Sequence, residues 1–241
     1  MGNWQLEDHG RVAVLTFTRP PANWMDFASM TELGDALEAV AARPDEISVV
    51  MLTGGLDGVF IAHADLDELA ALGRGEPIDG DRDAWKRATR LLEEIPQPTV
   101  TAIDGQAWAG GCEIAIASTM RVASDRAHLG QPEVPFGLIP GAGGTQRLPR
   151  LVGAGIGAEL VLSGRVVPAD EALRIGLLNA VLPTDGFRDA AITWCQAIAA
   201  NPAPALFAAK RAIVEGLRVP LDAGLLLEST LFAELNGAPA A

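Results

Sequence analysis

The feature that most constrains the fold is an alternation of short apolar strands with amphipathic helices. Runs rich in Val and Thr at residues 11–20, 47–55 and 99–105 end at proline or glycine, which is typical of strands. Apolar residues at helical spacing predict helices over residues 30–46 and 83–98. Over roughly the first 130 residues this order predicts stacked βαβ units, and therefore an α/β fold.

The chain after about residue 154 has a different pattern, in which most segments have helical periodicity. Its 241 residues are 49% apolar and 20% charged, a globular composition. We found no repeat and no low-complexity linker. The coarse expectation is one α/β domain followed by a helical extension.

Composition excludes several classes of protein. The net charge of -13 argues against sequence-independent nucleic-acid binding, which needs a basic face. The two cysteines, Cys112 and Cys195, lack the spacing of a metal or redox motif, so we expect a reducing compartment and no metal site. The chain shows neither the pattern of a signal peptide nor an apolar run long enough for a membrane span, so we expect a cytoplasmic protein without membrane contact.

One acidic residue, Glu113, lies in the apolar stretch GGCEIAIAS. An acid in such a run needs a partner, because Glu is rarely fully buried alone. The preceding Gly110 and Gly111 fit a helix start, where free N–H groups and the helix dipole accept negative charge and a ligand can approach closely. The alternative is a plain glycine-rich turn before a core helix.

A second acid, Glu133, lies between Pro132 and Pro135 in a segment with little surface character. The prolines restrain the backbone and hold this carboxylate at a set angle, unless the segment is an ordinary surface loop. The nearby GAGGTQR lacks the Lys-Ser/Thr ending of a phosphate loop. The match of GAGIGA to a dinucleotide motif is attributed to chance, since no strand precedes it.

Together these stretches resemble the enoyl-CoA hydratase/isomerase (crotonase) family. The matching residues are Phe60–Leu66, Gly110–Glu113, Gly130–Glu133 and Gly137–Leu148. The resemblance implies a spiral of ββα units, with a core at residues 1–190 and a helical region at 191–241 that belongs to the same functional unit and takes part in oligomerisation. It also implies a homotrimer or a dimer of trimers.

By the same resemblance, the substrate is an acyl-CoA thioester and no cofactor is needed beyond the CoA of the substrate. The backbone N–H groups of Ala62 and Gly110 would form the oxyanion hole. Glu113 would orient and activate water, and Glu133 would exchange a proton with Cα. Keeping both acids favours a hydratase that adds water across the 2,3 double bond; the alternatives are an enoyl-CoA isomerase and a catalytically idle binding subunit.

Further substrate-binding residues would be His63, Ala64, Asp65 and Trp108. His63 stands where the family usually has Gly, and it either shapes the pocket or points away from it. Trp108 either narrows the acyl pocket or packs in the core. Cys112 is interpreted as a small buried residue. The candidate partners for the phosphates of CoA are Arg19, Lys86, Arg87, Lys210 and Arg211. The alternative is that these residues are ordinary solvated surface charges.

Overall fold

The computed structural model describes residues 2–237. The strands are β1 (Trp4–His9), β2 (Val12–Phe17), β3 (Val49–Gly54), β4 (Val59–Ile61), β5 (Thr99–Ile103), β6 (Gln106–Trp108), β7 (Met120–Ser124), β8 (His128–Gly130), β9 (Val166–Pro168) and β10 (Ala180–Leu182). The helices are α1 (Phe27–Ala41), α2 (Leu66–Gly73), α3 (Ala84–Glu94), α4 (Gly110–Ala117), the 3-10 turn η1 (Val134–Phe136), α5 (Gly144–Val152), α6 (Ala154–Ser163), α7 (Ala169–Arg174), α8 (Phe187–Ala199), α9 (Ala203–Gly216) and α10 (Leu221–Leu235).

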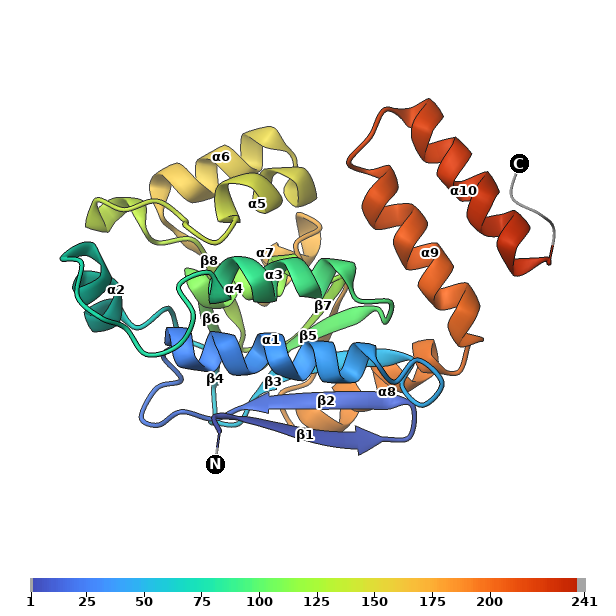
Figure 1. Ribbon diagram of the computed structural model, residues 1–241. Coiled ribbons are helices and arrows are strands. Elements are labelled where there is room, and N and C mark those ends of the chain that lie inside the picture. Colours follow the sequence, from blue (N-terminus) through green and yellow to red (C-terminus); the bar gives the residue numbers. More distant parts are fainter. Residues whose placement is uncertain (1, 238–241) are drawn as a thin grey trace.

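The strands form two sheets (Figure 1). The larger has the order β1-β2-β3-β5-β7-β10, and the smaller has the order β4-β6-β8-β9. Pairing is parallel except between β1 and β2 and between β8 and β9. Parallel pairing requires crossover connections, which the helices supply.

Successive turns of the chain repeat one unit. A strand of the large sheet is followed by a strand of the small sheet and then by helix, first as β3–β4–α2 and α3, then as β5–β6–α4, then as β7–β8–η1 and α5. This arrangement confirms the spiral of ββα units. It also places α4 in the middle of the molecule, with all eight of its residues buried.

The central strands are buried on both faces, so their sequences are continuous apolar runs rather than alternating ones. In β2, Leu15 and Phe17 join the main core under α1 and α3, whereas Val12 and Val14 pack with α8 on the other face. The boundary expected between residues 190 and 191 falls inside α8.

Five strands, β1, β4, β6, β9 and β10, have no counterpart in the sequence interpretation. β1 pairs with β2 in register over six residues, and the three-residue β9 and β10 pair with β8 and β7. The region after residue 154 is mostly helical, as expected, and is interrupted by the two three-residue strands β9 and β10. The strands β4, β6, β9 and β10 have three residues each, so their own periodicity is too brief to indicate them.

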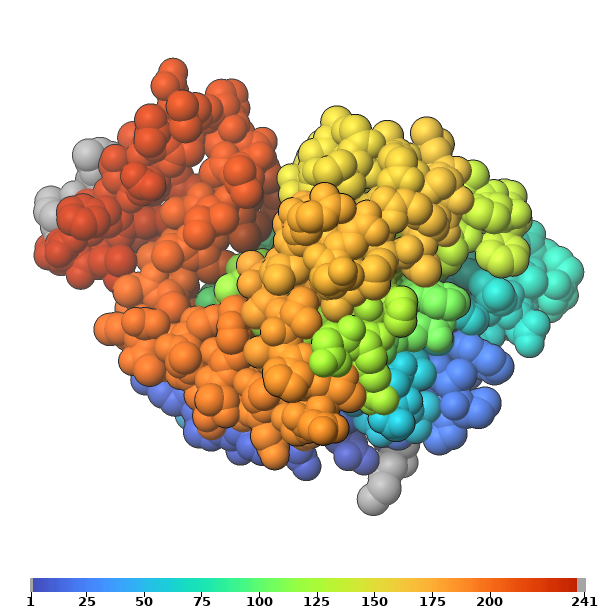
Figure 2. All heavy atoms as spheres, turned by 180° about the vertical axis from the view of Figure 1, so that it is seen from behind, coloured from blue at the N-terminus to red at the C-terminus, as the bar shows by residue number. Residues whose placement is uncertain are grey.

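Helices α9 and α10 form a hairpin that stands off from the rest of the molecule (Figures 1 and 2). One buried cation in α9, Lys210, fastens it to the body. Its Nζ donates to main-chain carbonyls at the end of α3 and just beyond, those of Leu92 at 3.2 Å, Ile95 at 2.7 Å and Gln97 at 2.9 Å. Among residues 2–237, no helix is long and apolar enough to cross a membrane.

Candidate active site

A cavity of about 680 Å³ opens between α2, α3, the start of α4 and the loop that leads into α5. Part of its wall is apolar, formed by Phe27, Leu66, Leu69, Trp85, Leu138 and Ile139. Its polar wall includes the carboxylates of Glu113 and Glu133. A mainly apolar pocket with a few converging polar groups is the usual form of a small-molecule site.

Glu113 lies in the first turn of α4 and is only 4% exposed. Its Oε1 accepts hydrogen bonds from the N–H of Ala142 at 2.7 Å and the N–H of Gly144 at 2.8 Å. Burial raises the pKa of Glu113, and these two N–H groups and the nearby Arg147 oppose the rise. The buried acid thus has partners that favour its ionised form.

Glu133 lies just before η1 and is less buried than Glu113. Burial is the main cause that raises its pKa to about 7, and the charge of Glu113 raises it further. The side-chain amide of the buried Gln131 lies 2.8 Å from Oε1 of Glu133. Two carboxyl groups on one cavity with pKa values pushed upward suit proton transfer near neutral pH.

The N–H of Gly110 is at the first position of α4, where an N–H has no intrahelical acceptor. The preceding Ala109 holds a left-handed backbone with φ 47°, a strained conformation for a residue with a Cβ. A Cβ on Gly110 would lie 3.4 Å from the backbone N of Ala64 and 2.6 Å from the ring of Trp85. Two main-chain N–H groups therefore lie beside each other at the cavity wall.

The structure corrects the expected partner of Gly110. The N–H of Ala62 donates to the carbonyl of Asn23 at 3.2 Å, and Ala62 is 3% exposed and does not line the cavity. Ala64 does line it. The neighbours of Ala64 on both sides bond to Met25, and because peptide groups alternate along an extended chain, the amide of Ala64 faces away from Met25.

His63 lines the cavity, whereas Asp65 and Trp108 do not. The Nδ1 of His63 lies 2.7 Å from the carbonyl of Ala64, and its ring stacks on Trp24 with centroids 6.0 Å apart. Asp65 accepts from a backbone N–H in the first turn of α2 and pairs with Arg19 at 3.0 Å. Trp108 belongs to β6, and its indole nitrogen has no hydrogen-bond partner among the described residues.

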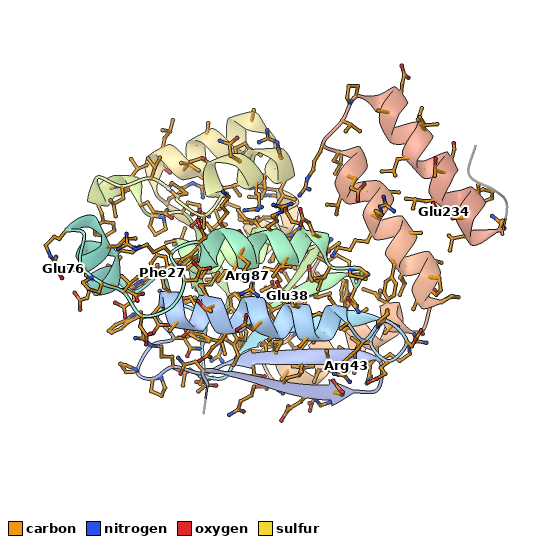
Figure 3. The ribbon with its side chains drawn as sticks, in the orientation of Figure 1. Phe27, Glu38, Arg43, Glu76, Arg87 and Glu234 are labelled. Atoms are coloured by element: carbon orange, nitrogen blue, oxygen red, sulfur yellow. The ribbon has the colours of Figure 1, made fainter. Side chains whose placement is uncertain are left out.

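The candidate phosphate partners separate into different roles. Arg19, Arg87 and Arg211 are held in ion pairs with carboxylates, and Figure 3 shows Arg87 beside Glu38 between α3 and α1. The Nζ of Lys210 donates hydrogen bonds to backbone carbonyls instead. Lys86 lines the cavity, together with Arg82, and within residues 2–237 neither has a carboxylate partner.

Two groups of site residues escaped the sequence interpretation. One is the pair of N–H groups from Ala142 and Gly144, which come from the glycine-rich stretch GAGGTQR; that stretch had been rejected as a phosphate loop and used only as a family motif. The other is Arg147, at the end of the same stretch. Cys112 was correctly interpreted: it is fully buried, and burial raises the pKa of its thiol to about 12, so it is not a nucleophile.

Comparisons with known proteins agree with this geometry. The sequence matches the model of the enoyl-CoA hydratase/isomerase family over residues 7–238. It is 38% identical to the short-chain-enoyl-CoA hydratase of Clostridium acetobutylicum, over 97% of this chain and 89% of that protein, and 38% identical to the 2,3-dehydroadipyl-CoA hydratase of Escherichia coli, over 93% and 87%. The crystal structure of an enoyl-CoA hydratase from Bacillus anthracis superimposes with a TM-score of 0.90 at 35% identity, covering 98% of this chain and 92% of that one. The chain therefore belongs to the enoyl-CoA hydratase/isomerase family.

Proposed function

We propose that this protein is an enoyl-CoA hydratase, which adds water across the 2,3 double bond of a 2-enoyl-CoA thioester. The observation that carries the proposal is that Glu113 and Glu133 line one cavity beside the N–H groups of Ala64 and Gly110. Two relatives at 38% identity, one named short-chain-enoyl-CoA hydratase and the other 2,3-dehydroadipyl-CoA hydratase, support the same reaction. The reaction consumes only water and the thioester, so we propose that it uses no cofactor.

The N–H groups of Ala64 and Gly110 act on the thioester oxygen. When water adds to C3, the electrons of the double bond move toward the carbonyl and negative charge builds on its oxygen. Two fixed donors stabilise this charge, and losing one such donor in other enzymes costs about 3 kcal/mol. The dipole of α4, which begins at Gly110, adds to the stabilisation.

The two acids move the protons. Ionised Glu113, held by two N–H groups, accepts a proton from the water as the C3–O bond forms. Protonated Glu133 gives its proton to Cα, which neutralises the enolate. Glu113 then carries a proton and Glu133 has lost one, and a single proton exchange restores the starting state. An isomerase needs one acid that moves a proton between two carbons, so the pair of acids favours hydration.

Two further features of the protein belong to this proposal. Arg82 and Lys86, at the cavity wall without carboxylate partners among the described residues, are placed to meet the anionic groups of CoA.

Exposed apolar side chains on the α9–α10 hairpin support a homotrimer or a dimer of trimers that covers them, since large exposed patches mark interaction surfaces. The most exposed of them are Leu217 (84%), Leu221 (75%) and Phe232 (70%).

The test is the mass of the product formed from crotonyl-CoA, because hydration adds one water and isomerisation adds nothing. We expect the purified protein to form 3-hydroxybutyryl-CoA. Glu113→Gln and Glu133→Gln should each lower kcat by a factor of about 10² to 10⁴ while CoA ligands still bind. A product of unchanged mass, or full hydration by either variant, would overturn the proposal.

A further inference from the structure

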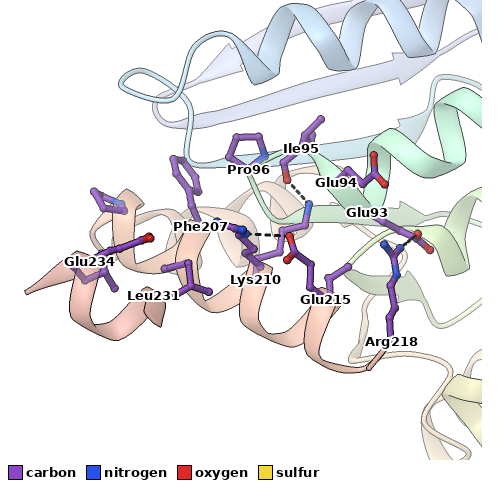
Figure 4. Close-up of a pocket in the computed structure, with 15 residues that line it drawn as sticks. Glu93, Glu94, Ile95, Pro96, Phe207, Lys210, Glu215, Arg218, Leu231 and Glu234 are labelled. Atoms are coloured by element: carbon purple, nitrogen blue, oxygen red, sulfur yellow. Dashed lines mark hydrogen bonds and ion pairs between the residues drawn. The ribbon is translucent and has the colours of Figure 1, made fainter. Parts of the chain in front are cut away.

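One carboxylate outside the catalytic cavity connects three helices. Glu93, near the end of α3 and 20% exposed, pairs with Arg147 of α5 at 2.5 Å and also with Arg218, just beyond α9. It lines a second cavity, of about 770 Å³, between α3 and the C-terminal hairpin. Figure 4 shows Glu93 and Arg218 facing each other there.

Arg147 extends from this pair to the loop at residues 142–144, which is called the catalytic loop below. Its Nη1 donates to the carbonyl of Ala142 at 2.8 Å, and Ala142 in turn donates its N–H to Glu113 at 2.7 Å. The guanidinium also lies against the loop itself, because a Cβ on Gly143 would come within 2.1 Å of Nη1. Glu93 is therefore linked to Glu113 by a short chain of hydrogen bonds through Arg147 and one peptide group.

We propose that Glu93 is a positioning residue for Glu113: by holding Arg147 it fixes the loop at residues 142–144 whose N–H groups orient the catalytic carboxylate. The proposal rests on the proposed function of Glu113. Because the same carboxylate binds Arg218, the seating of the C-terminal hairpin is linked to the geometry of the catalytic loop.

The charge balance at Glu93 explains why loss of its carboxylate would disturb the catalytic loop. Both partners of the Glu93–Arg147 pair are about one-fifth exposed, at 20% and 21%, so solvent screens the pair only in part. Without the carboxylate, Arg147 and Arg218 become neighbouring cations that repel each other, and removing one partner of a shielded pair leaves the other without compensation. Arg147 then leaves the Ala142 carbonyl, and the loop no longer holds its two N–H groups at Glu113.

The test compares Glu93→Gln with Glu94→Gln. The control removes the next carboxylate on the same helix, which forms an exposed pair with Arg90. For Glu93→Gln we expect kcat to fall by about tenfold or more with KM nearly unchanged, since small displacements of a catalytic group cost up to about 10²-fold. The acid limb of its pH–rate profile should move to higher pH, because Glu113 loses donors that favour its ionised form.

A loss of melting temperature with an unchanged kcat and an unchanged acid limb would mean that Glu93 is only structural, and would overturn the proposal. Should Glu93→Gln fold poorly, Arg147→Lys keeps the charge but cannot donate to both Glu93 and Ala142, and we expect the same shift of the acid limb. A wild-type protein that does not hydrate enoyl-CoA contradicts the proposed function instead. A crystal structure of the variant then decides the positioning role: we expect the Ala142 N–H to lie beyond about 3.5 Å of Glu113, and an unchanged hydrogen bond would overturn the proposal.

Discussion

The raised pKa of Glu133 predicts how hydration varies with pH. In the proposed mechanism the residue delivers a proton to Cα, so the free enzyme should be active only while Glu133 is protonated. Its pKa of about 7, raised mainly by burial, places this titration inside the range of an ordinary assay. Activity should therefore fall as pH rises through about 7, and kcat/KM reports this free-enzyme value.

The expected size of the effect follows from that value. With a pKa of about 7, Glu133 is about nine-tenths protonated at about pH 6 and about one-tenth protonated at about pH 8. The kcat/KM for hydration should thus drop about tenfold between these two pH values and keep falling about tenfold for each further unit. Below neutrality a second limb should appear where Glu113 becomes protonated, at a pH above the usual range of a glutamate, because burial raises its pKa.

The assay is the loss of absorbance of the crotonyl-CoA double bond at a substrate concentration well below KM, over about pH 5 to about pH 9. Glu133→Gln should lose the alkaline limb along with most of its activity, whereas Glu94→Gln should keep both limbs. A kcat/KM that stays constant through this range, or that rises above pH 7, would refute the reasoning. The second outcome would mean that Glu133 acts in its ionised form and that the roles of the two acids are exchanged.

Three substitutions test other parts of the structure. Gly110→Ala should lower kcat by about 10²-fold or more, because the new methyl group would lie 3.4 Å from the N of Ala64 and press on Trp85; activity near that of wild type would place the oxyanion hole elsewhere. Lys210→Met should lower the free energy of unfolding, measured by denaturant titration, by about 1 to 3 kcal/mol, because three buried carbonyls lose their donor; unchanged stability would mean that the hairpin is held by other contacts. Cys112→Ala should keep kcat within about twofold, because the thiol is buried and protonated; a large loss of kcat in a folded variant would give the thiol a chemical role.

The matched control for Gly110→Ala is Gly155→Ala, in α6, where an added Cβ meets nothing within 4 Å. This control should retain full activity and gain a little stability from the better helix propensity of alanine. A comparable loss of activity in both variants would show that the effect at Gly110 is not local to the oxyanion hole.

The sequence was sufficient to predict that Glu113 and Glu133 belong to one site. Glu113 needed a partner because it lies in an apolar run, and glycines before it indicated a helix start. Both interpretations hold in the structure, and Glu133 lines the same cavity. Periodicity predicted the alternation of strands and helices, because it survives in a single sequence when the elements are long enough, whereas the spiral of ββα units was implied by the resemblance to the family.

Other details depend on contacts that local sequence does not encode. The matching motif located the segment around residues 60–66 but did not tell which amide faces the cavity; the bonds of the segment to Asn23 and Met25 decide that, and they leave Ala64 rather than Ala62 free. Lys210 resembled an exposed phosphate partner because its carbonyl acceptors lie more than 110 residues away. The role of Ala142 and Gly144 was hidden for the same reason, since a backbone N–H carries no side-chain signal.

We propose that the thioester oxygen of the substrate lies between the N–H groups of Ala64 and Gly110 while both acids face the 2,3 double bond. A crystal structure with butyryl-CoA, a saturated thioester that cannot be hydrated, tests this most directly. We predict that the thioester oxygen lies within about 2.7 to 3.1 Å of both nitrogens, with Glu113 and Glu133 on the side of C2 and C3. A thioester oxygen that contacts neither amide, or an acyl chain that lies away from the two glutamates, would contradict the account.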